Sequence, residues 1–288
     1  MPTSYKIVIV SISISALILL ALALPSTKAS NKLIPNNNHL INNLTEEIST
    51  KSLEDILLYK PEVKILFFGD TIMLDPIDKM VKDPSFNPFK NLLDTFKEYD
   101  YIVGDQEGPI DGSSVGSPNL NKPYQFDSPK EAIRVYVESG IDAFSYANNH
   151  ARDYGPKSLM HTMELLHQAG IQTFGAGSNK TEAFKPLQID LYGNRISLLS
   201  YNCAEYIHNI ADDYTPGTAS YSEYYVKNSI QTAKSNSDIV IVMAHCGTEN
   251  TSEPNNMQIQ WANIFTSAGA DIVIGGHTHT RQSPATVN

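Results

Sequence analysis

Polar side chains that can bind metal follow several apolar segments of this chain, at the points where predicted strands end. The segment Gly275–His279 (GGHTH) places two histidines at a spacing of two behind the apolar run Ile272–Ile274. The segment Asn148–His150 (NNH) follows the run Ile141–Tyr146 in the same way. The other side chains of this kind, each close to the end of an apolar run, are Asp70, Glu107 and His245. Paired histidines behind a buried strand are awkward as purely structural residues, so we interpret these segments as parts of one functional site.

The carboxyl ends of parallel strands gather at one edge of a sheet. We therefore expect five strands of a single sheet to direct carboxylates, an amide and several imidazoles to one edge. Such a group repels itself or stays unsatisfied unless a cation lies within it. Oxygen and imidazole ligands without thiolates favour divalent ions of the Mn, Fe or Zn type, one or two in number. Two ions about 3.5–4 Å apart would stabilise the attacking and leaving oxygens of a displacement at phosphorus.

Three further motifs have weaker interpretations. We interpret Gly175–Asn179 (GAGSN) as a tight strand-to-helix turn, with an anion-binding loop as the alternative. Glu249 and the pair Arg152–Asp153 are interpreted as solvated charges, with a supporting role behind the site as the alternative. The histidines assigned to surface or packing roles are His161, His167 and His208.

Strand and helix signals alternate from Val63 to the end of the chain, which predicts a layered α/β protein. The predicted strands are Val63–Phe68, Tyr101–Val103, Ile141–Tyr146, Ile171–Phe174, Leu187–Leu191, Arg195–Tyr201, Asp238–Ala244 and Asp271–Gly275. The predicted helices are Pro88–Tyr99, a helix opened by the capping box Ser128–Glu131 and closed by Gly140, Pro156–Ala169, Ser222–Ser235 and Asn256–Ala268. The last two strands lack polar alternation, so both faces of their sheet should be covered.

The N-terminus predicts export from the cytoplasm. The run Ile7–Leu24 carries no charge, Lys6 precedes it, and small residues follow Pro25. The run is also long enough to span most of a bilayer core. Residues 1–29 are therefore either a cleaved signal peptide or an uncleaved membrane anchor. Residues 30–60 are rich in Asn, Ser, Thr and Lys and predict a polar linker, and residues 61–288 form the predicted globular domain.

The charge of the chain disfavours one class of partner. The formal net charge is −10, and removal of the first 29 residues, which carry Lys6 and Lys28 and no acidic residue, makes it −12. This balance disfavours non-specific binding to nucleic acid or to an anionic bilayer surface. An anionic substrate stays possible because a bound metal reverses the charge locally.

The chain has two cysteines, Cys203 and Cys246. They are too few for a disulfide scaffold, and no CxxC motif is present. They could form one disulfide outside the cell, but we expect two free thiols.

The order of these motifs resembles the CapA family, also described as poly-γ-glutamate capsule biosynthesis proteins and related to the calcineurin-like metallophosphoesterases. The matching segments are Gly69–Leu74, Glu107, Ala147–Gly155, Gly175–Gly177, His245–Glu249 and Gly276–His279, within about Val63 to Thr280. The resemblance implies a four-layer α/β/β/α sandwich of the metallophosphoesterase type with a dinuclear metal site. The ligands that it implies are Asp70, Glu107, Asn149, His245, His277 and His279, with His150 as a substrate-binding residue or general acid.

The chain also departs from the pattern that it resembles. Ile72 stands where calcineurin-like enzymes have histidine, and Glu107 stands where they have aspartate. We therefore expect one metal position to be weaker, or occupied only with substrate. The family usually continues past the paired histidines with further strands, whereas this chain ends nine residues after His279. The chain is thus expected to be truncated, or to have an incomplete final sheet edge.

Two kinds of function remain compatible with these observations. The first is an extracytoplasmic, metal-dependent hydrolase or transferase of the phosphoesterase type, which acts on a phosphoester or a cell-surface polymer. The second is a non-catalytic assembly or anchoring factor that binds an anionic polymer such as polyglutamate, together with capsule-synthesis membrane proteins. The ligand set favours the first, while Ile72 and the short C-terminus favour the second.

Overall fold

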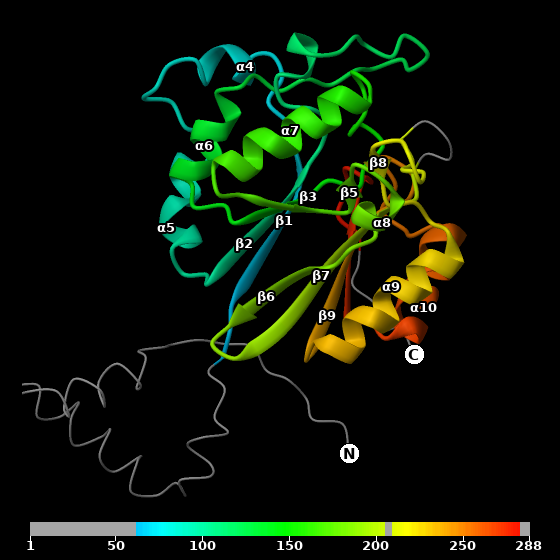
Figure 1. Cartoon of the computed structure of the whole chain (residues 1–288). Helices are drawn as coiled ribbons and strands as arrows, with labels where there is room; N and C mark the ends of the chain where they lie inside the picture. Colours follow the sequence, from blue (N-terminus) through cyan, green and yellow to red (C-terminus); the bar gives the residue numbers. More distant parts are fainter. Residues whose placement is uncertain (1–61, 205–208, 283–288) are drawn as a thin grey trace, which may run out of the picture. The chain divides into compact units, whose positions relative to one another are not determined.

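The computed structural model describes residues 62–204 and 209–282 of the chain (Figure 1). The residues from Lys64 onward belong to one compact unit. The predicted N-terminal segment 1–29 and the predicted linker 30–60 lie outside the described residues. Within those described residues, none of the helices has the length and apolar character needed to cross a bilayer.

The first half of the described chain builds a four-stranded parallel sheet. Its order is β1 (Ile65–Thr71), β2 (Tyr101–Gln106), β3 (Ala143–Ser145) and β4 (Gln172–Phe174). The helices that accompany these strands are α4 (Ile77–Met80), η1 (Lys90–Leu92), α5 (Leu93–Phe96), η2 (Gly112–Ser114), α6 (Ala132–Glu138) and α7 (Pro156–Gln168). The strands lie where the sequence predicts them, to within a few residues.

The second half builds another four-stranded sheet, in the order β10, β9, β7 and β6. The strands are β6 (Leu187–Leu191), β7 (Asn194–Asn202), β9 (Ile239–His245) and β10 (Ile272–Gly276). The predicted hairpin of β6 and β7 is antiparallel, and the other pairs are parallel. The remaining elements are β5 (Ala176–Gly177), which pairs with β8 (Gly217–Thr218), and the helices α8 (Lys180–Ala183), α9 (Glu223–Asn236) and α10 (Asn256–Ala268).

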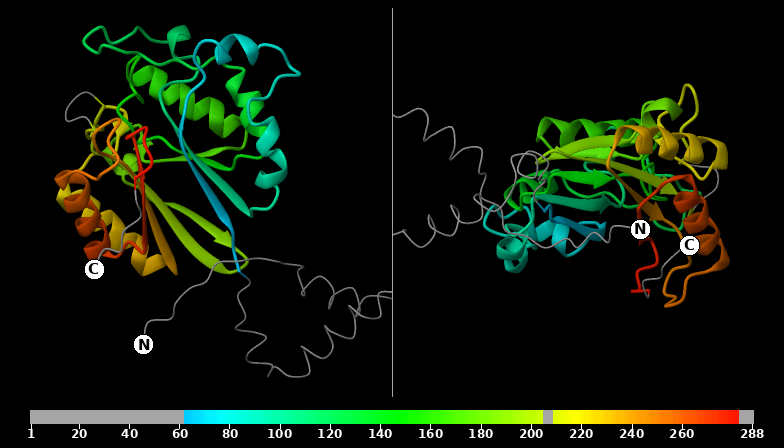
Figure 2. Two further views of the ribbon diagram at one scale, coloured as in Figure 1. Left: turned by 180° about the vertical axis from the view of Figure 1, so that it is seen from behind. Right: turned by 90° about the horizontal axis from the view of Figure 1, so that it is seen from below.

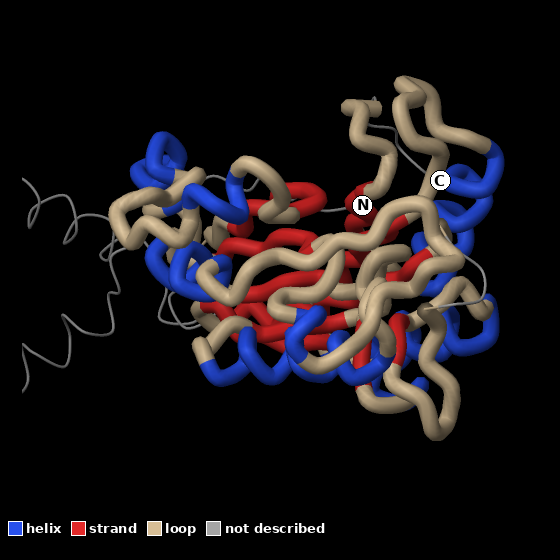
Figure 3. Tube along the Cα trace, turned by 90° about the horizontal axis from the view of Figure 1, so that it is seen from above, coloured by secondary structure: helices blue, strands red, loops and turns tan. Residues whose placement is uncertain are grey.

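The two sheets pack face to face and carry helices on their outer faces (Figures 1 and 2). Tyr136 of α6 packs with Ile102 and Phe144 of the first sheet in one apolar core. Val226 of α9 and Phe265 of α10 pack with β7 and β9 in another. The view from above shows the strands between helices on both sides (Figure 3). The fold is therefore the four-layer α/β/β/α sandwich that the family resemblance implies.

The expectation of a single five-stranded edge is wrong, because the strands divide between two sheets. A parallel-strand pattern in the sequence does not specify which strands are neighbours. The sheets meet through buried residues such as Ser145 of β3 and Ser200 of β7, whose hydroxyls lie 2.7 Å apart. The apolar run of β9 is accordingly covered by α9 on one face and by the first sheet on the other. Its coverage on both faces was predicted, but the identity of the covering layers was not.

The predicted capping box Ser128–Glu131 is also wrong. Helix α6 begins at Ala132, and its N-cap residue Glu131 makes no side-chain capping hydrogen bond. The hydroxyl of Ser128 instead accepts a hydrogen bond from the backbone N–H of Met73, at 3.1 Å. A contact between distant segments has replaced the local one. The predicted helix over 88–99 is likewise shorter and is divided between η1 and α5.

Cys203 and Cys246 form a disulfide, so the expectation of two free thiols is wrong. The residues before them, Asn202 and His245, are register partners in the adjacent parallel strands β7 and β9. The two cysteines therefore emerge side by side at the strand ends, with their Cα atoms 4.8 Å apart. Their separation of 43 residues in the sequence conceals this adjacency.

Candidate metal centre

The first sheet contributes carboxylates at the carboxyl ends of two adjacent strands. Asp70 lies near the end of β1, and Asp105 and Glu107 lie at the end of β2. Asp105 and Glu107 are each only 3% exposed. The side chain of Asp70 is 13% exposed. Three carboxylates are thus largely removed from solvent at the same edge of the sandwich.

The second sheet contributes histidines. His245 ends β9, and His277 and His279 follow β10. Both His277 and His279 have left-handed backbone conformations, with φ of 79° and 52°, which cost free energy for residues other than glycine and cluster at functional sites. Gly276 permits the close approach of the two sheets, because a Cβ atom there would lie 3.0 Å from Asp70 Oδ1. We call the six residues of the two sheets the metal cluster: Asp70, Asp105, Glu107, His245, His277 and His279.

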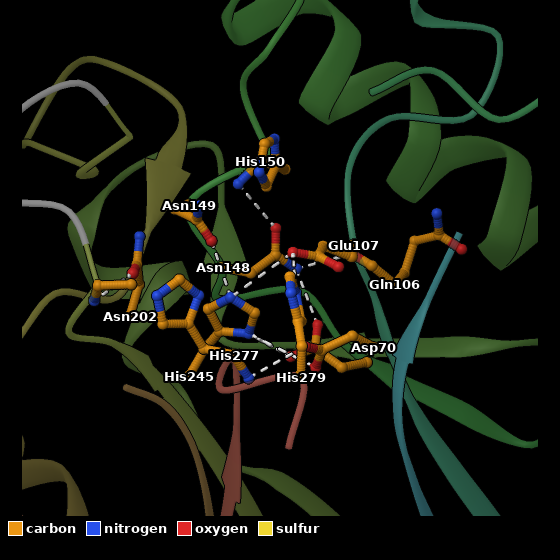
Figure 4. Close-up of polar contacts among 12 residues, drawn as sticks. Asp70, Gln106, Glu107, Asn148, Asn149, His150, Asn202, His245, His277 and His279 are labelled. Carbon is orange, nitrogen blue, oxygen red and sulfur yellow. Dashed lines mark hydrogen bonds and ion pairs between the residues drawn. The ribbon is translucent and has the colours of Figure 1, made fainter. Parts of the chain in front are cut away.

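The side chains of the metal cluster that Figure 4 labels converge, and they are Asp70, Glu107, His245, His277 and His279. His245 Nδ1 lies 3.0 Å from Asp105 Oδ2 and 3.8 Å from Asp70 Oδ1. His279 Nε2 lies 3.8 Å from Asp70 Oδ2 and 4.0 Å from Glu107 Oε1. Two overlapping groups could each hold an ion, one formed by Asp70, Glu107 and His279 and the other by Asp70, Asp105 and His245. The structure therefore brings Asp70, Glu107, His245 and His279 together, as the sequence predicts.

Several buried atoms of the metal cluster lack the partners that their burial requires. Asp70 Oδ1 and His277 Nδ1 have no hydrogen-bond partner. His245 faces oxygens with both ring nitrogens, because Nε2 lies 2.8 Å from Asn149 Oδ1 in the amide orientation of the structure. A neutral imidazole has a single N–H, so His245 can donate to only one of these two oxygens. A cation would relieve each of these defects.

The electrostatics of the metal cluster agree with this interpretation. Burial, joined by neighbouring carboxylates, raises the pKa of Glu107 to about 8, and burial raises the pKa of Asp105 to about 7. Burial lowers the pKa of both His245 and His277 to about 4, which keeps their imidazoles neutral and able to coordinate. No lysine or arginine of the described residues forms an ion pair with these carboxylates. The donor set therefore fits a divalent metal ion.

Asp105 was missed as a ligand candidate. The segment GDQEG offers two acidic residues, and the family resemblance implies only Glu107 as a ligand. Asp105 is nevertheless the carboxylate closest to His245, and it accepts a hydrogen bond from Asn148 Nδ2 at 2.8 Å. Asn148, fully buried, thereby fixes the carboxylate. A cavity of about 210 Å³ between the sheets borders Asp70 and Asp105, with Phe67, Met243 and Ile274 among its walls.

His150 lies outside both of the ligand groups, in a separate arrangement that we call the His150 pocket: His150, Asp153, Lys122 and Phe126. Its Nδ1 atom lies 2.5 Å from Asp153 Oδ2, and its ring stacks on Phe126 with centroids 3.7 Å apart. Asp153 is fully buried, so the interpretation of this residue as a solvated charge is wrong. Sequence spacing alone could not show that the chain folds Asp153 back onto His150.

Arg152 is half-buried, so the interpretation of it as a solvated charge is wrong. The remaining sequence motifs have the roles assigned to them, with one exception that lies outside the described residues. Gly175–Asn179 is a strand-to-helix turn, in which Asn179 accepts a hydrogen bond from Glu182 N and caps α8. Glu249 is exposed, although its charge affects the pKa values of Glu107 and His277. His161 and His167 contact only surface or packing partners. His208 lies outside the described residues.

Residues 64–287 match the family described as bacterial capsule synthesis protein PGA_cap, and the chain belongs to this family. It is 28% identical over 215 residues to a "PGA biosynthesis protein CapA" from Bacillus subtilis (strain 168), covering 74% of this chain and 56% of that protein. It is 29% identical over 202 residues to a "Capsule biosynthesis protein CapA" from Bacillus anthracis, covering 68% of this chain and 49% of that protein. The chain thus spans about half the length of these relatives. Among solved structures, a hypothetical protein from Thermus thermophilus superposes with a TM-score of 0.48 at 18% identity, covering 77% of this chain and 71% of the other.

Proposed function

We propose that this protein is a metal-dependent enzyme of the phosphoesterase type that acts outside the cytoplasm in the synthesis or export of a poly-γ-glutamate capsule. The observation that carries the proposal is the set of unsatisfied buried atoms in the metal cluster, above all Asp70 Oδ1 and His277 Nδ1. Native proteins seldom bury polar atoms without partners, so the exceptions call for an explanation. One or two divalent ions would provide it.

The residues that would hold the ions are the six of the metal cluster together with Asn149. When bound, a divalent ion supplies Lewis-acid stabilisation of negative charge on a phosphoryl oxygen. His150 would act beside it as the general acid, because Asp153 occupies Nδ1 and Nε2 has no hydrogen-bond partner within the described part of the chain. When the ring is doubly protonated, with Nδ1–H toward Asp153, the Nε2 proton can be given to a leaving oxygen.

The charge of the protein supports a metal-first order of binding. A net charge of −10 repels a phosphoester or an anionic polymer. Bound ions would reverse the sign of the charge at the cluster while leaving the rest of the surface acidic. Anionic substrates would then bind only at the metal cluster, which confines them to the position that His150 can reach.

The predicted export signal of residues 1–29 and the disulfide Cys203–Cys246 support a location outside the cytoplasm, since disulfides persist in oxidising compartments. The N-terminal segment would either be cleaved or hold the protein at the membrane, where membrane proteins of capsule synthesis would be its partners. Family membership and the names of the relatives support the capsule role.

The second candidate is a non-catalytic factor that binds the anionic polymer during assembly or anchoring. It is favoured by Ile72, which offers no ligand two residues after Asp70 where calcineurin-like enzymes have a histidine. In this case the ions would bind the carboxylates of the polymer and no bond would be broken.

One experiment separates the two. Metal content, hydrolysis of p-nitrophenyl phosphate and bis-p-nitrophenyl phosphate, and binding of poly-γ-glutamate are measured for the wild type, H277A and the surface control H167A. An enzyme should show metal-dependent hydrolysis that H277A loses and H167A keeps. Metal-dependent polymer binding without hydrolysis would establish the second candidate. A wild-type protein that binds no divalent ion would exclude both.

A further inference from the structure

The loop before α6 contributes a buried cation, Lys122, to the His150 pocket. We propose that Lys122 is a positioning residue that holds His150 and the candidate ligand Asn149 in one fixed arrangement. The inference rests on the proposed function, because it gives Lys122 a role in the same site. It adds a residue from a segment that none of the site motifs includes.

Lys122 is 9% exposed, which is rare for a lysine, and its ammonium group reaches one short segment of the chain at three points. Its Nζ atom donates to Asp153 Oδ1 at 2.7 Å and to the backbone carbonyl of Asn149 at 2.6 Å. It also lies 3.4 Å from His150 Nδ1. One ammonium group thus joins the residue before His150 to the carboxylate that His150 contacts.

The two oxygens of the Asp153 carboxylate have different partners, and these partners explain why a cation is needed beside Asp153. One oxygen, Oδ1, accepts from Lys122, while Oδ2 accepts from the Phe126 backbone N–H at 2.8 Å and lies 2.5 Å from His150 Nδ1. An ionised carboxylate only accepts hydrogen bonds, so Nδ1 of His150 must carry the proton in this contact. Without Lys122 the buried carboxylate would lack its cation and could rotate or draw in water. The ring of His150 would then lose its fixed orientation.

The loop that carries Lys122 is itself fastened to the same segment. The Asn119 backbone N–H donates to the Asp153 carbonyl at 2.7 Å, and the Phe126 ring stacks on His150 at an interplanar angle of 18°. The loop therefore fixes the plane of the imidazole through Phe126 and its hydrogen bond through Lys122. Both restraints act on His150, and both come from residues outside the metal cluster.

The test uses K122M in the full chain, with K79M as the matched control. Lys79 forms an exposed ion pair with Asp75, so its loss removes a lysine without disturbing the site. The first readout is the ring signal of His150 in metal-free protein labelled with 15N-histidine. In the wild type, the Nδ1 proton should give a downfield signal that exchanges slowly with water, and H150A assigns it by its absence. K122M should broaden or lose this signal, and K79M should keep it. An unchanged signal in folded K122M would overturn the proposal.

The second readout is the dependence of turnover on the leaving group. For phenyl phosphate, K122M should lower kcat by about 10–100-fold with little change in KM, and for p-nitrophenyl phosphate it should change kcat by less than about threefold. In the H150A background, K122M should cause no further loss, because both changes remove the same contribution. A loss that adds fully to that of H150A would overturn the proposal.

Two outcomes separate this proposal from the proposed function. If the wild type hydrolyses neither substrate, the phosphoesterase function fails, while the ring signal still decides the role of Lys122. If K122M does not fold, K122Q, whose amide can replace one of the two hydrogen bonds, takes its place in both measurements. Failure of both variants to fold would assign Lys122 a purely structural role and overturn the proposal.

Discussion

The metal cluster and the His150 pocket lie side by side, yet they differ in whether the chain itself compensates their buried charge. In the His150 pocket the Asp153 carboxylate has Lys122, His150 and a backbone N–H as partners, so its charge is compensated by the chain itself. In the metal cluster three carboxylates share no lysine or arginine among the described residues, and Asp70 Oδ1 and His277 Nδ1 have no partner. The first region is complete as folded, and the second requires an external cation.

This difference indicates that the two regions have different roles in the site. A general acid must keep its geometry in the absence of substrate, and hydrogen bonds from the chain provide that preorganisation. A metal site must instead keep lone pairs free, which costs stability until the ion arrives. The left-handed backbone conformations of His277 and His279 also lie in the metal cluster. The comparison predicts that changes in the two regions will have different consequences.

The largest effect is expected for Asp70→Asn. Asp70 belongs to both ligand groups, so the variant should lower metal affinity by at least about 100-fold and abolish detectable hydrolysis. Asparagine can still accept the hydrogen bond that Asp70 Oδ2 receives from the His277 backbone N–H at 3.0 Å. The metal-free variant should therefore be no less stable than metal-free wild type, since one repelling charge is gone. D94N, which removes a surface carboxylate, is the control for metal titration by calorimetry and for thermal melts. Normal metal binding by D70N would remove the basis of the comparison.

His150→Ala should have a smaller and more selective effect. It should keep the metal content of the wild type, yet slow turnover of a substrate with a poor leaving group by about 10²–10⁴-fold. With p-nitrophenolate as leaving group most of that loss should disappear, because no proton is needed. Metal analysis and kinetics on both substrate types check this, with H167A as the control. If H150A lost metal as completely as D70N, the two regions would not be functionally separate.

The sequence predicts where these two regions lie in the fold better than it predicts which residues contact one another within them. Every strand that carries a site residue could be located, because unbroken apolar runs ending in Gly, Asp, Asn or His are local patterns. The ligand candidates Asp70, Glu107, His245 and His279 follow from that placement and from the family resemblance. The structure places them in two overlapping groups, each of which could hold an ion.

What could not be predicted depends on contacts between segments far apart in the chain. The division into two sheets, the disulfide of Cys203 with Cys246, and the contact of Lys122 with Asp153 across 31 residues have no local signal. Asp105 was missed for a different reason, since GDQEG offers two acidic residues and only the fold shows that Asp105 faces His245. Ser128 does not cap helix α6, because its hydroxyl accepts a hydrogen bond from the Met73 backbone N–H in place of one from the first turn of the helix.

The smallest predicted effect concerns the pH dependence of stability, and it belongs to the metal cluster alone. The raised pKa values of Asp105 and Glu107, about 7 and 8, mean that the folded metal-free protein holds protons that the unfolded chain has released above about pH 4–5. Their contribution to stability is present at low pH and is lost as the pH rises through 7 and 8. The lowered pKa values of His245 and His277, about 4, act in the opposite direction, and their stabilising effect is complete above about pH 6.5. Between pH 4 and 6.5 the two effects therefore oppose each other.

From pH 6.5 to 8 only the carboxyl contribution remains. The metal-free protein should therefore lose stability over this range, on the order of 1–3 kcal/mol, because the unfolded state binds fewer protons than the folded state. Urea denaturation at pH 6.5 and pH 8 in the presence of a chelator measures the loss. Glu107→Gln should reduce it, while saturating divalent metal should abolish it by compensating the ionised carboxylates. Lys79→Met, remote from the cluster, should leave it unchanged. A metal-free protein that is as stable at pH 8 as at pH 6.5 would show that the carboxylates of the metal cluster are compensated without an ion, as the carboxylate of the His150 pocket is.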